Sequence, residues 1–129
     1  MDPAGFAQRV LGDLAGIGIR AQAEVRQVDP ATADVWFEHE PAPAVGVSIA
    51  TGQPSVRIVW ASYTFDAVPV ELAGHLVTQL FSGAVDLRRM GRVLPRYVMT
   101  VDIDGNEFSA SRSDSADMEE WELALAAGG

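Results

Sequence analysis

Apolar residues recur at the spacing of an amphipathic helix in three stretches of this chain. The stretches are residues 3–15, 68–81 and 116–127. In each, the apolar positions lie three or four residues apart, so they share one face of a helix. These positions are Phe6, Val10 and Leu14 in the first stretch, Val68, Leu72, Leu76 and Leu80 in the second, and Met118, Trp121 and Leu125 in the third.

Residues that favour helix ends flank these three stretches. Asp2 is the expected N-cap of the first helix, because its carboxylate can accept a hydrogen bond from a free backbone N–H group. Asp66 is the expected cap of the middle helix, and Gly83 is expected to end it in a left-handed conformation. Either Asp114 or Ser115 is expected to cap the last helix, whose acidic first turns suit the positive end of the helix dipole.

Between the predicted helices, apolar and polar residues alternate in a way that is typical of half-buried strands. The predicted strands are residues 19–28, 33–40, 45–50 and 55–65 before the middle helix, and 84–90, 93–103 and 106–112 after it. Short turn-like segments separate them, which favours antiparallel pairing. We therefore predict one α+β domain over residues 1–129, with an antiparallel sheet of about six to seven strands and three helices, in the order helix–strands–helix–strands–helix.

The stretch "VDIDGNEF", residues 101–108, places several oxygen-bearing side chains close together. A calcium loop counted from Asp102 would need glycine at its sixth position and glutamate at its twelfth, and it has neither. Asp104-Gly105 between two alternating runs instead predicts a two-residue β-hairpin turn. The expected facing pairs are Met99 with Ala110, Val101 with Phe108, and Asp102 with Glu107. The last pair has like charges, so we expect water, a cation or an arginine to screen it.

Composition narrows the classes of function. The net charge is −9, which opposes binding to nucleic acid, and no apolar run is long enough to span a membrane. The nine basic residues are all arginine, and the absence of cysteine and lysine excludes disulfides, thiolate ligands, Schiff bases and the lysine of a P-loop. The absence of cysteine also suits a reducing cytoplasm, and the use of arginine and alanine suggests a GC-rich, bacterial type of genome. We expect no signal peptide, since the first residues lack a basic head followed by an apolar stretch.

Catalytic motifs are not evident in the sequence. His39 and His75 lack the spacing of metal ligands, and the glutamates beside His39 point to the opposite face of its predicted strand. No Gly-x-Ser-x-Gly nucleophile motif occurs. We therefore expect no enzymatic activity, no cofactor and no metal site.

Two features predict a surface that binds a protein partner. Four of the nine basic residues, Arg88, Arg89, Arg92 and Arg96, lie within nine positions of an otherwise acidic chain. They either balance nearby carboxylates or recognise an acidic partner, because guanidinium groups form paired hydrogen bonds with carboxylates and phosphates. Trp36 lies beside Phe37 and Trp60 lies near Tyr63, each pair on a predicted strand. One ring of each pair would be exposed unless a helix or a partner covers it.

The order of elements, the acidity and the lack of cysteine resemble the class I type III secretion chaperones and related small bacterial proteins of that fold. The resemblance implies a non-enzymatic homodimer that holds an extended segment of a client protein. One departure is Gly12, which interrupts the first helix, the region through which such chaperones contact clients. Two alternatives remain open: a small acidic immunity protein that neutralises a toxin domain, and a small enzyme or ligand-binding fold that uses His39 or His75.

Overall fold

The structure, a computed structural model, describes residues 2–113 and 117–128. The described chain has three helices and eight strands. They are α1 (Pro3–Gly16), β1 (Gln22–Asp29), β2 (Thr32–Glu38), β3 (Val45–Ala50), β4 (Ser55–Trp60), β5 (Tyr63–Pro69), α2 (Val70–Ser82), β6 (Asp86–Met90), β7 (Arg96–Ile103), β8 (Asn106–Ser113) and α3 (Glu120–Gly128). The predicted α+β class and the predicted order of helices and strands are confirmed.

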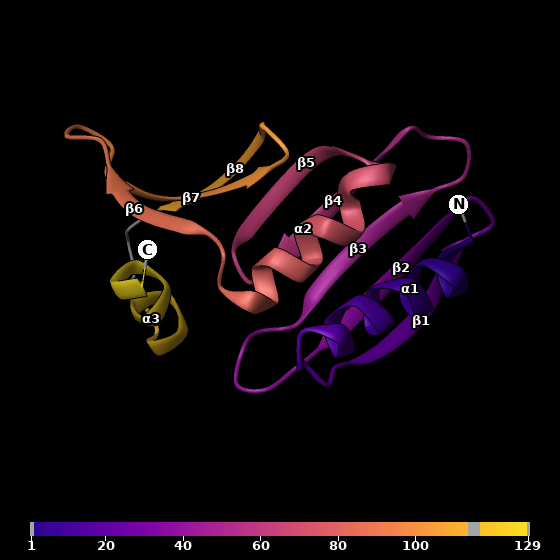
Figure 1. Ribbon diagram of the computed structural model, residues 1–129. Coiled ribbons are helices and arrows are strands. Elements are labelled where there is room, and N and C mark those ends of the chain that lie inside the picture. Colours follow the sequence, from indigo (N-terminus) through magenta and orange to yellow (C-terminus); the bar gives the residue numbers. More distant parts are fainter. Residues whose placement is uncertain (1, 114–116, 129) are drawn as a thin grey trace.

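The eight strands form two antiparallel sheets where the sequence predicted one. Strands β1 to β5 form a meander in which each strand pairs with the next, and β6 to β8 form a smaller sheet. The sheets meet where the edge strands β5 and β8 lie side by side without forming a ladder. The smaller sheet therefore lies on the side of β5 that is away from β1 (Figure 1).

The predicted single strand over residues 55–65 is in fact a hairpin. The chain turns at Ala61 and Ser62, so that Trp60 and Tyr63 become direct register partners in β4 and β5. Ala61 has a φ of 52°, a left-handed conformation that is uncommon for a residue with a side chain. The turn contains no Gly, Asn or Pro, the residues that usually indicate a turn in a sequence. The prediction therefore joined β4 and the start of β5 into one strand.

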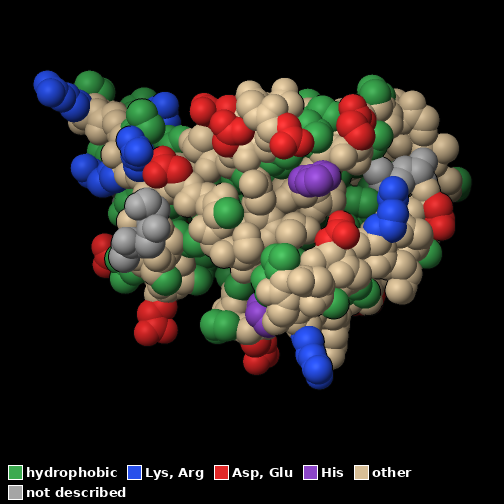
Figure 2. Space-filling view, in the orientation of Figure 1, with side chains coloured by type: hydrophobic (Ala, Val, Ile, Leu, Met, Phe, Trp, Pro, Cys, Tyr) green, Lys and Arg blue, Asp and Glu red, His purple; other side chains and the backbone are tan. Residues whose placement is uncertain are grey.

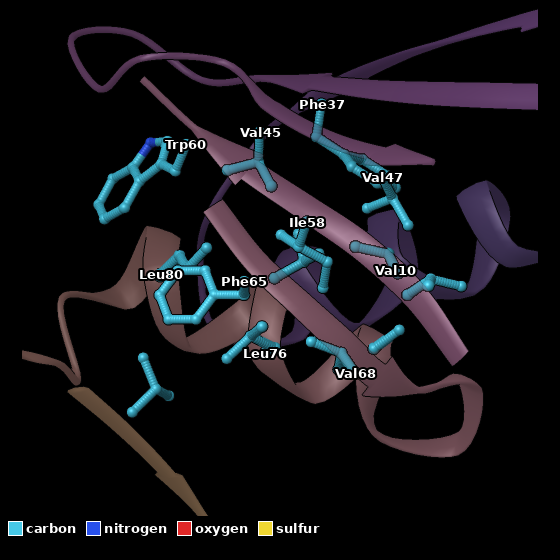
Figure 3. Close-up of a cluster of buried hydrophobic side chains, with 14 of the residues drawn as sticks. Val10, Phe37, Val45, Val47, Ile58, Trp60, Phe65, Val68, Leu76 and Leu80 are labelled. Carbon is cyan, nitrogen blue, oxygen red and sulfur yellow. The ribbon is translucent and has the colours of Figure 1, made fainter. Parts of the chain in front are cut away.

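Helices α1 and α2 cover one face of the five-stranded sheet (Figure 1). Their apolar stripes meet the inward side chains of the strands, and the labelled residues in Figure 3 show this layer. Asp2 caps α1 as predicted, because its side chain accepts a hydrogen bond from the Gly5 backbone N–H at 3.0 Å. Gly83 ends α2 with a φ of 79°, also as predicted.

The predicted cap at Asp66 is wrong. Strand β5 continues to Pro69, which occupies the N-cap position of α2 without a side-chain hydrogen bond. Asp66 lies within β5 and accepts a hydrogen bond from the Arg57 Nε atom at 2.7 Å on the uncovered face of the sheet. The pairing of β5 with β4 therefore overrides the local preference of Asp66 for a helix start. The predicted caps Asp114 and Ser115 lie outside the described residues.

The β7–β8 hairpin has the predicted turn and register. Asp104 and Gly105 have φ values of 52° and 85°, as a type I′ turn requires. Met99 faces Ala110, Val101 faces Phe108 and Asp102 faces Glu107. The Asp102 Oδ1 atom accepts a hydrogen bond from the Gly105 backbone N–H at 3.0 Å. The Asp102 carboxylate therefore helps to hold the turn closed, and the screening of the Asp102–Glu107 pair by water, a cation or an arginine stays a prediction.

Substituting Gly105 by alanine is expected to lower the free energy of unfolding by about 1 kcal/mol, because a Cβ atom strains a left-handed residue. Gly12→Ala is the matched control. Its added Cβ in α1 would meet no atom within 4 Å, and alanine favours the helix by about 0.5–1 kcal/mol. Urea denaturation of both variants tests the pair, and equal shifts of the two midpoints would contradict it.

Candidate functional site

The most exposed apolar side chains lie at the end of the β6–β7 hairpin, which projects from the body of the molecule (Figure 1). Val93 is 91% exposed, Leu94 is 78% exposed and Met90 is 49% exposed. Single exposed apolar residues are common on proteins, but three within five positions on a projecting loop form a patch. We call residues 88–96 the hairpin tip.

The four predicted arginines belong to this hairpin tip. Arg88 pairs with Asp86 through Nε and Oδ2 at 2.9 Å, which fits the alternative that it balances a local carboxylate. Arg92 and Arg96 are exposed, and among the described residues the structure records no ion pair for either. Basic side chains accordingly gather at this end of the molecule (Figure 2).

Charge is unevenly distributed along the chain. The segment 86–96 holds four arginines and one aspartate, which gives it a net charge of +3. Since the whole chain has a net charge of −9, the remaining residues together carry −12. The hairpin tip therefore combines exposed apolar side chains with a local positive charge on an acidic protein. This combination suits a partner surface that is apolar at its centre and acidic at its rim.

Trp36 lies on the other exposed feature, the face of the five-stranded sheet that α1 and α2 leave uncovered. Its indole ring lies over Gly46 on the neighbouring strand, where an added Cβ would meet ring atoms at 2.8 Å. The missing side chain at position 46 thus lets the ring lie flat against the backbone. The ring remains half-buried, with one side against the sheet.

Carboxylates flank this ring on the same face of the sheet. Asp34 and Glu38 lie two residues before and after Trp36 on β2, so their side chains point the same way. Glu24 faces Trp36 from β1, where it pairs with Arg26 at 3.1 Å. We call Asp34, Trp36 and Glu38 the Trp36 face.

Trp60, the other predicted partner-binding tryptophan, lies in the core. Only 2% of its surface is exposed, and it lies among the buried side chains of Figure 3. Its Nε1 atom donates a hydrogen bond to the Pro43 carbonyl oxygen at 2.9 Å, and its ring centre lies 4.7 Å from that of Trp121 on α3. The sequence left open whether a helix covers it, and α3 does. Trp60 therefore offers no surface to a partner in this structure.

A buried polar cluster joins α3 to the two sheets. The Glu122 Oε2 atom accepts hydrogen bonds from the Tyr63 hydroxyl at 2.6 Å and from the Arg112 Nε atom at 2.8 Å. Its Oε1 atom accepts from Arg112 Nη2 at 2.9 Å and from the Glu119 backbone N–H at 3.0 Å. The side chains of Arg112 and Glu122 are 11% and 3% exposed. The Arg112 guanidinium also lies over the Tyr97 ring, 4.5 Å from its centre.

These contacts shift the proton affinities of the cluster. Burial alone would raise the pKa of Glu122, but the hydrogen bonds from Arg112, Tyr63 and the Glu119 backbone outweigh it and hold the pKa below its ordinary value. The pKa of Tyr63 is raised, first by burial and then by the hydrogen bond to the Glu122 carboxylate. The hydrogen bond to Glu122 likewise raises the pKa of Arg112. At neutral pH the cluster holds a charged Arg–Glu pair and a neutral tyrosine.

A small cavity of about 100 Å³ lies beside this cluster, lined by Tyr63, Arg112, Trp121 and Glu122 among others. This volume holds about three water molecules. The four hydrogen bonds to Glu122 come from donors of the protein itself, so its carboxylate has no free position from which to act as a general base. The arrangement fastens α3 to the body of the protein and supports no catalytic role.

The two histidines lie apart from this cluster. His39 follows β2, and its Nδ1 atom lies 2.9 Å from the Arg20 carbonyl oxygen. Its ring meets Phe81 edge-on at 6.1 Å between centres. His75 is exposed on α2. Within residues 2–113 and 117–128, no group of three or more His, Asp or Glu side chains could hold a metal ion.

The sequence interpretation did not identify the Tyr63–Arg112–Glu122 cluster. A signal for it was present, because Glu122 lies on the same helix face as Met118, Trp121 and Leu125. A charged residue on an apolar helix face needs a partner when it is buried. The identity of that partner depended on the pairing of distant strands, which the sequence does not show.

No protein-family model matches this chain, and neither a curated protein nor a solved structure matches it. In the described part of the chain, no helix has the length and apolar character needed to cross a membrane.

Proposed function

We propose that this protein is a non-enzymatic protein-binding module that engages an acidic protein surface through its hairpin tip. The observation that carries the proposal is the exposure of Val93 and Leu94 beside Arg92 and Arg96, which form no ion pair with the described residues. Exposed apolar side chains supply the area to be buried, and arginine is enriched in protein interfaces because it forms paired hydrogen bonds with carboxylates. Such a surface supports a chaperone-like or regulatory role, in which the tip holds a partner or client.

The sign of the charge separates this proposal from the alternatives. An immunity protein of the acidic kind would meet a basic toxin through carboxylates, whereas the hairpin tip is positive. Nucleic acid would meet the tip but would be repelled by the −12 carried by the rest of the chain. A protein surface with an apolar centre and an acidic rim can contact both the apolar side chains and the arginines of the tip.

A capture experiment with a matched pair of variants tests the proposal. In the tip variant, Val93→Asp and Leu94→Asp replace exposed apolar side chains by carboxylates. In the control, Val28→Asp makes the same kind of change at a residue that is 59% exposed at the far end of β1. Immobilised wild-type protein and the control are expected to retain the same partner from a native extract, and the tip variant is expected to lose it at least about tenfold.

Ionic strength gives a second measurement of the same contact. Raising the salt concentration from about 0.1 M to about 1 M shortens the screening length from about 10 Å to about 3 Å, so retention should fall.

Equal retention by the tip variant and the wild type would contradict the proposal. Recovery of a small molecule in place of a protein would contradict it as well.

A further inference from the structure

The hairpin tip and the Trp36 face are complementary in chemistry, yet they cannot meet within one molecule. The five-stranded sheet runs in the order β1 to β5, and the smaller sheet lies beyond β5. The Trp36 face, on β2, therefore lies toward one end of the molecule, and the hairpin tip projects from the other (Figure 1). Any contact between them needs two copies of the chain.

We propose that the hairpin tip docks on the Trp36 face of a second copy of this chain. The inference rests on the proposed function, for which it names the acidic surface. Charge complementarity supports it, because the segment with the tip carries +3 and the Trp36 face carries the carboxylates of Asp34 and Glu38. The tip would place a positive, apolar loop on a negative face with an aromatic centre.

The arrangement along β2 fits arginine side chains. The half-buried Trp36 ring lies flat against the sheet over Gly46, and an arginine stacks well on the face of an indole. Asp34 and Glu38 lie on either side of the ring, each about 7 Å along the strand. Arg26 faces Asp34 from β1, but its ion pair is with Glu24. Among the described residues neither Asp34 nor Glu38 has an ion pair, so both can accept hydrogen bonds from Arg92 or Arg96 of the second copy.

Apolar contact would accompany these charges. Val59 lies on the same face as Gly46, which it pairs with from β4, and it is half-buried. The exposed side chains of Val93 and Leu94 can pack against Val59 and the edge of the indole. Such contact would exclude water from the arginine–carboxylate hydrogen bonds and strengthen them.

Each copy carries one tip and one face, so a pair of chains can make the contact twice. Two reciprocal contacts related by a two-fold axis give a closed dimer. Contacts that do not close in this way would extend into a filament. Light scattering distinguishes a particle of twice 13.8 kDa from a larger, concentration-dependent assembly.

Charge reversal on the two surfaces provides the test. One variant carries R92E and R96E, and the other carries D34R and E38R. Each alone is expected to run as a 13.8 kDa monomer, because it sets like charges against each other in both contacts. An equimolar mixture is expected to recover the dimer, since each mixed contact again joins opposite charges. Circular dichroism melting of each variant confirms that it is folded.

The outcomes separate this inference from the proposed function. A wild-type protein that remains a monomer at about 100 μM overturns the inference, and so does a mixture of variants that fails to associate. A wild-type dimer that both folded variants retain also overturns it, because the contact then lies elsewhere. Should the inference fail while the V93D/L94D variant still loses a captured protein, the proposed function stands with a different partner.

Discussion

Replacing Glu122 by glutamine is expected to lower the free energy of unfolding by about 3–5 kcal/mol, the usual cost of removing one partner of a buried ion pair. The carboxylate accepts four hydrogen bonds, two at each oxygen. An amide has only one oxygen, and its NH₂ group would face donors from Arg112 and Glu119 in one orientation, or from Arg112 and Tyr63 in the other. The Arg112 charge would then remain buried without its counter-charge.

Glu120→Gln is the matched control, since it makes the same change two residues earlier at an exposed position of α3. Its expected effect is below about 1 kcal/mol, the usual value for a charge near a helix N-terminus. Urea denaturation at neutral pH measures both variants. A similar midpoint for Glu122→Gln and Glu120→Gln would show that the Arg112–Glu122 pair contributes little to stability.

The same pair predicts a dependence of stability on pH. The pKa of Glu122 in the folded protein lies below its ordinary value of 4.5, which applies to the unfolded chain. Its contribution is therefore complete above pH 4.5 and is lost as the pH falls through the lower, folded value. The wild type should lose stability over this acidic range more steeply than Glu122→Gln. Parallel curves for the two proteins would contradict the assignment of the shift to Glu122.

The parts of the fold that the sequence predicted have local causes. Asp2 and Gly83 act through backbone groups within a few residues, and Asp104-Gly105 sets both the turn and the register of the β7–β8 hairpin. The same local logic failed at Asp66, where pairing of β5 with β4 competes with capping and wins. The Ala61–Ser62 turn had no local signal, so one strand was predicted where two exist.

The candidate site was predicted in part. The cluster of arginines can be seen in the sequence, because the charge and the spacing of residues are read directly from it. Its place on a projecting hairpin, beside the exposed Val93 and Leu94, depends on the fold. Trp36 and Trp60 have similar sequence surroundings. Only the tertiary structure shows that α3 covers Trp60, while none of the described helices covers the Trp36 side of the sheet. Long-range packing therefore separates a core tryptophan from a surface one.

This difference leads to the second large effect. Trp60→Ala is expected to lower the free energy of unfolding by about 3–5 kcal/mol, the usual cost of removing a buried tryptophan. The indole links the five-stranded sheet to α3 through its contact with the tilted Trp121 ring, and it donates a hydrogen bond to the Pro43 carbonyl oxygen. The variant would lose the buried apolar area and that hydrogen bond, and it would weaken the attachment of α3.

Trp36→Ala removes the same side chain from the uncovered face and is the matched control. Its expected cost is about 1 kcal/mol, because the ring is only half-buried and leaves no enclosed cavity. Thermal and urea unfolding, at a concentration where both variants are monomeric, give the comparison. If Trp36→Ala costs as much as Trp60→Ala, the ring over Gly46 belongs to the structural core, and a role for it in binding a second copy loses its basis. A large difference leaves Trp36 free to serve the interface, since residues that stability does not require can be used for recognition.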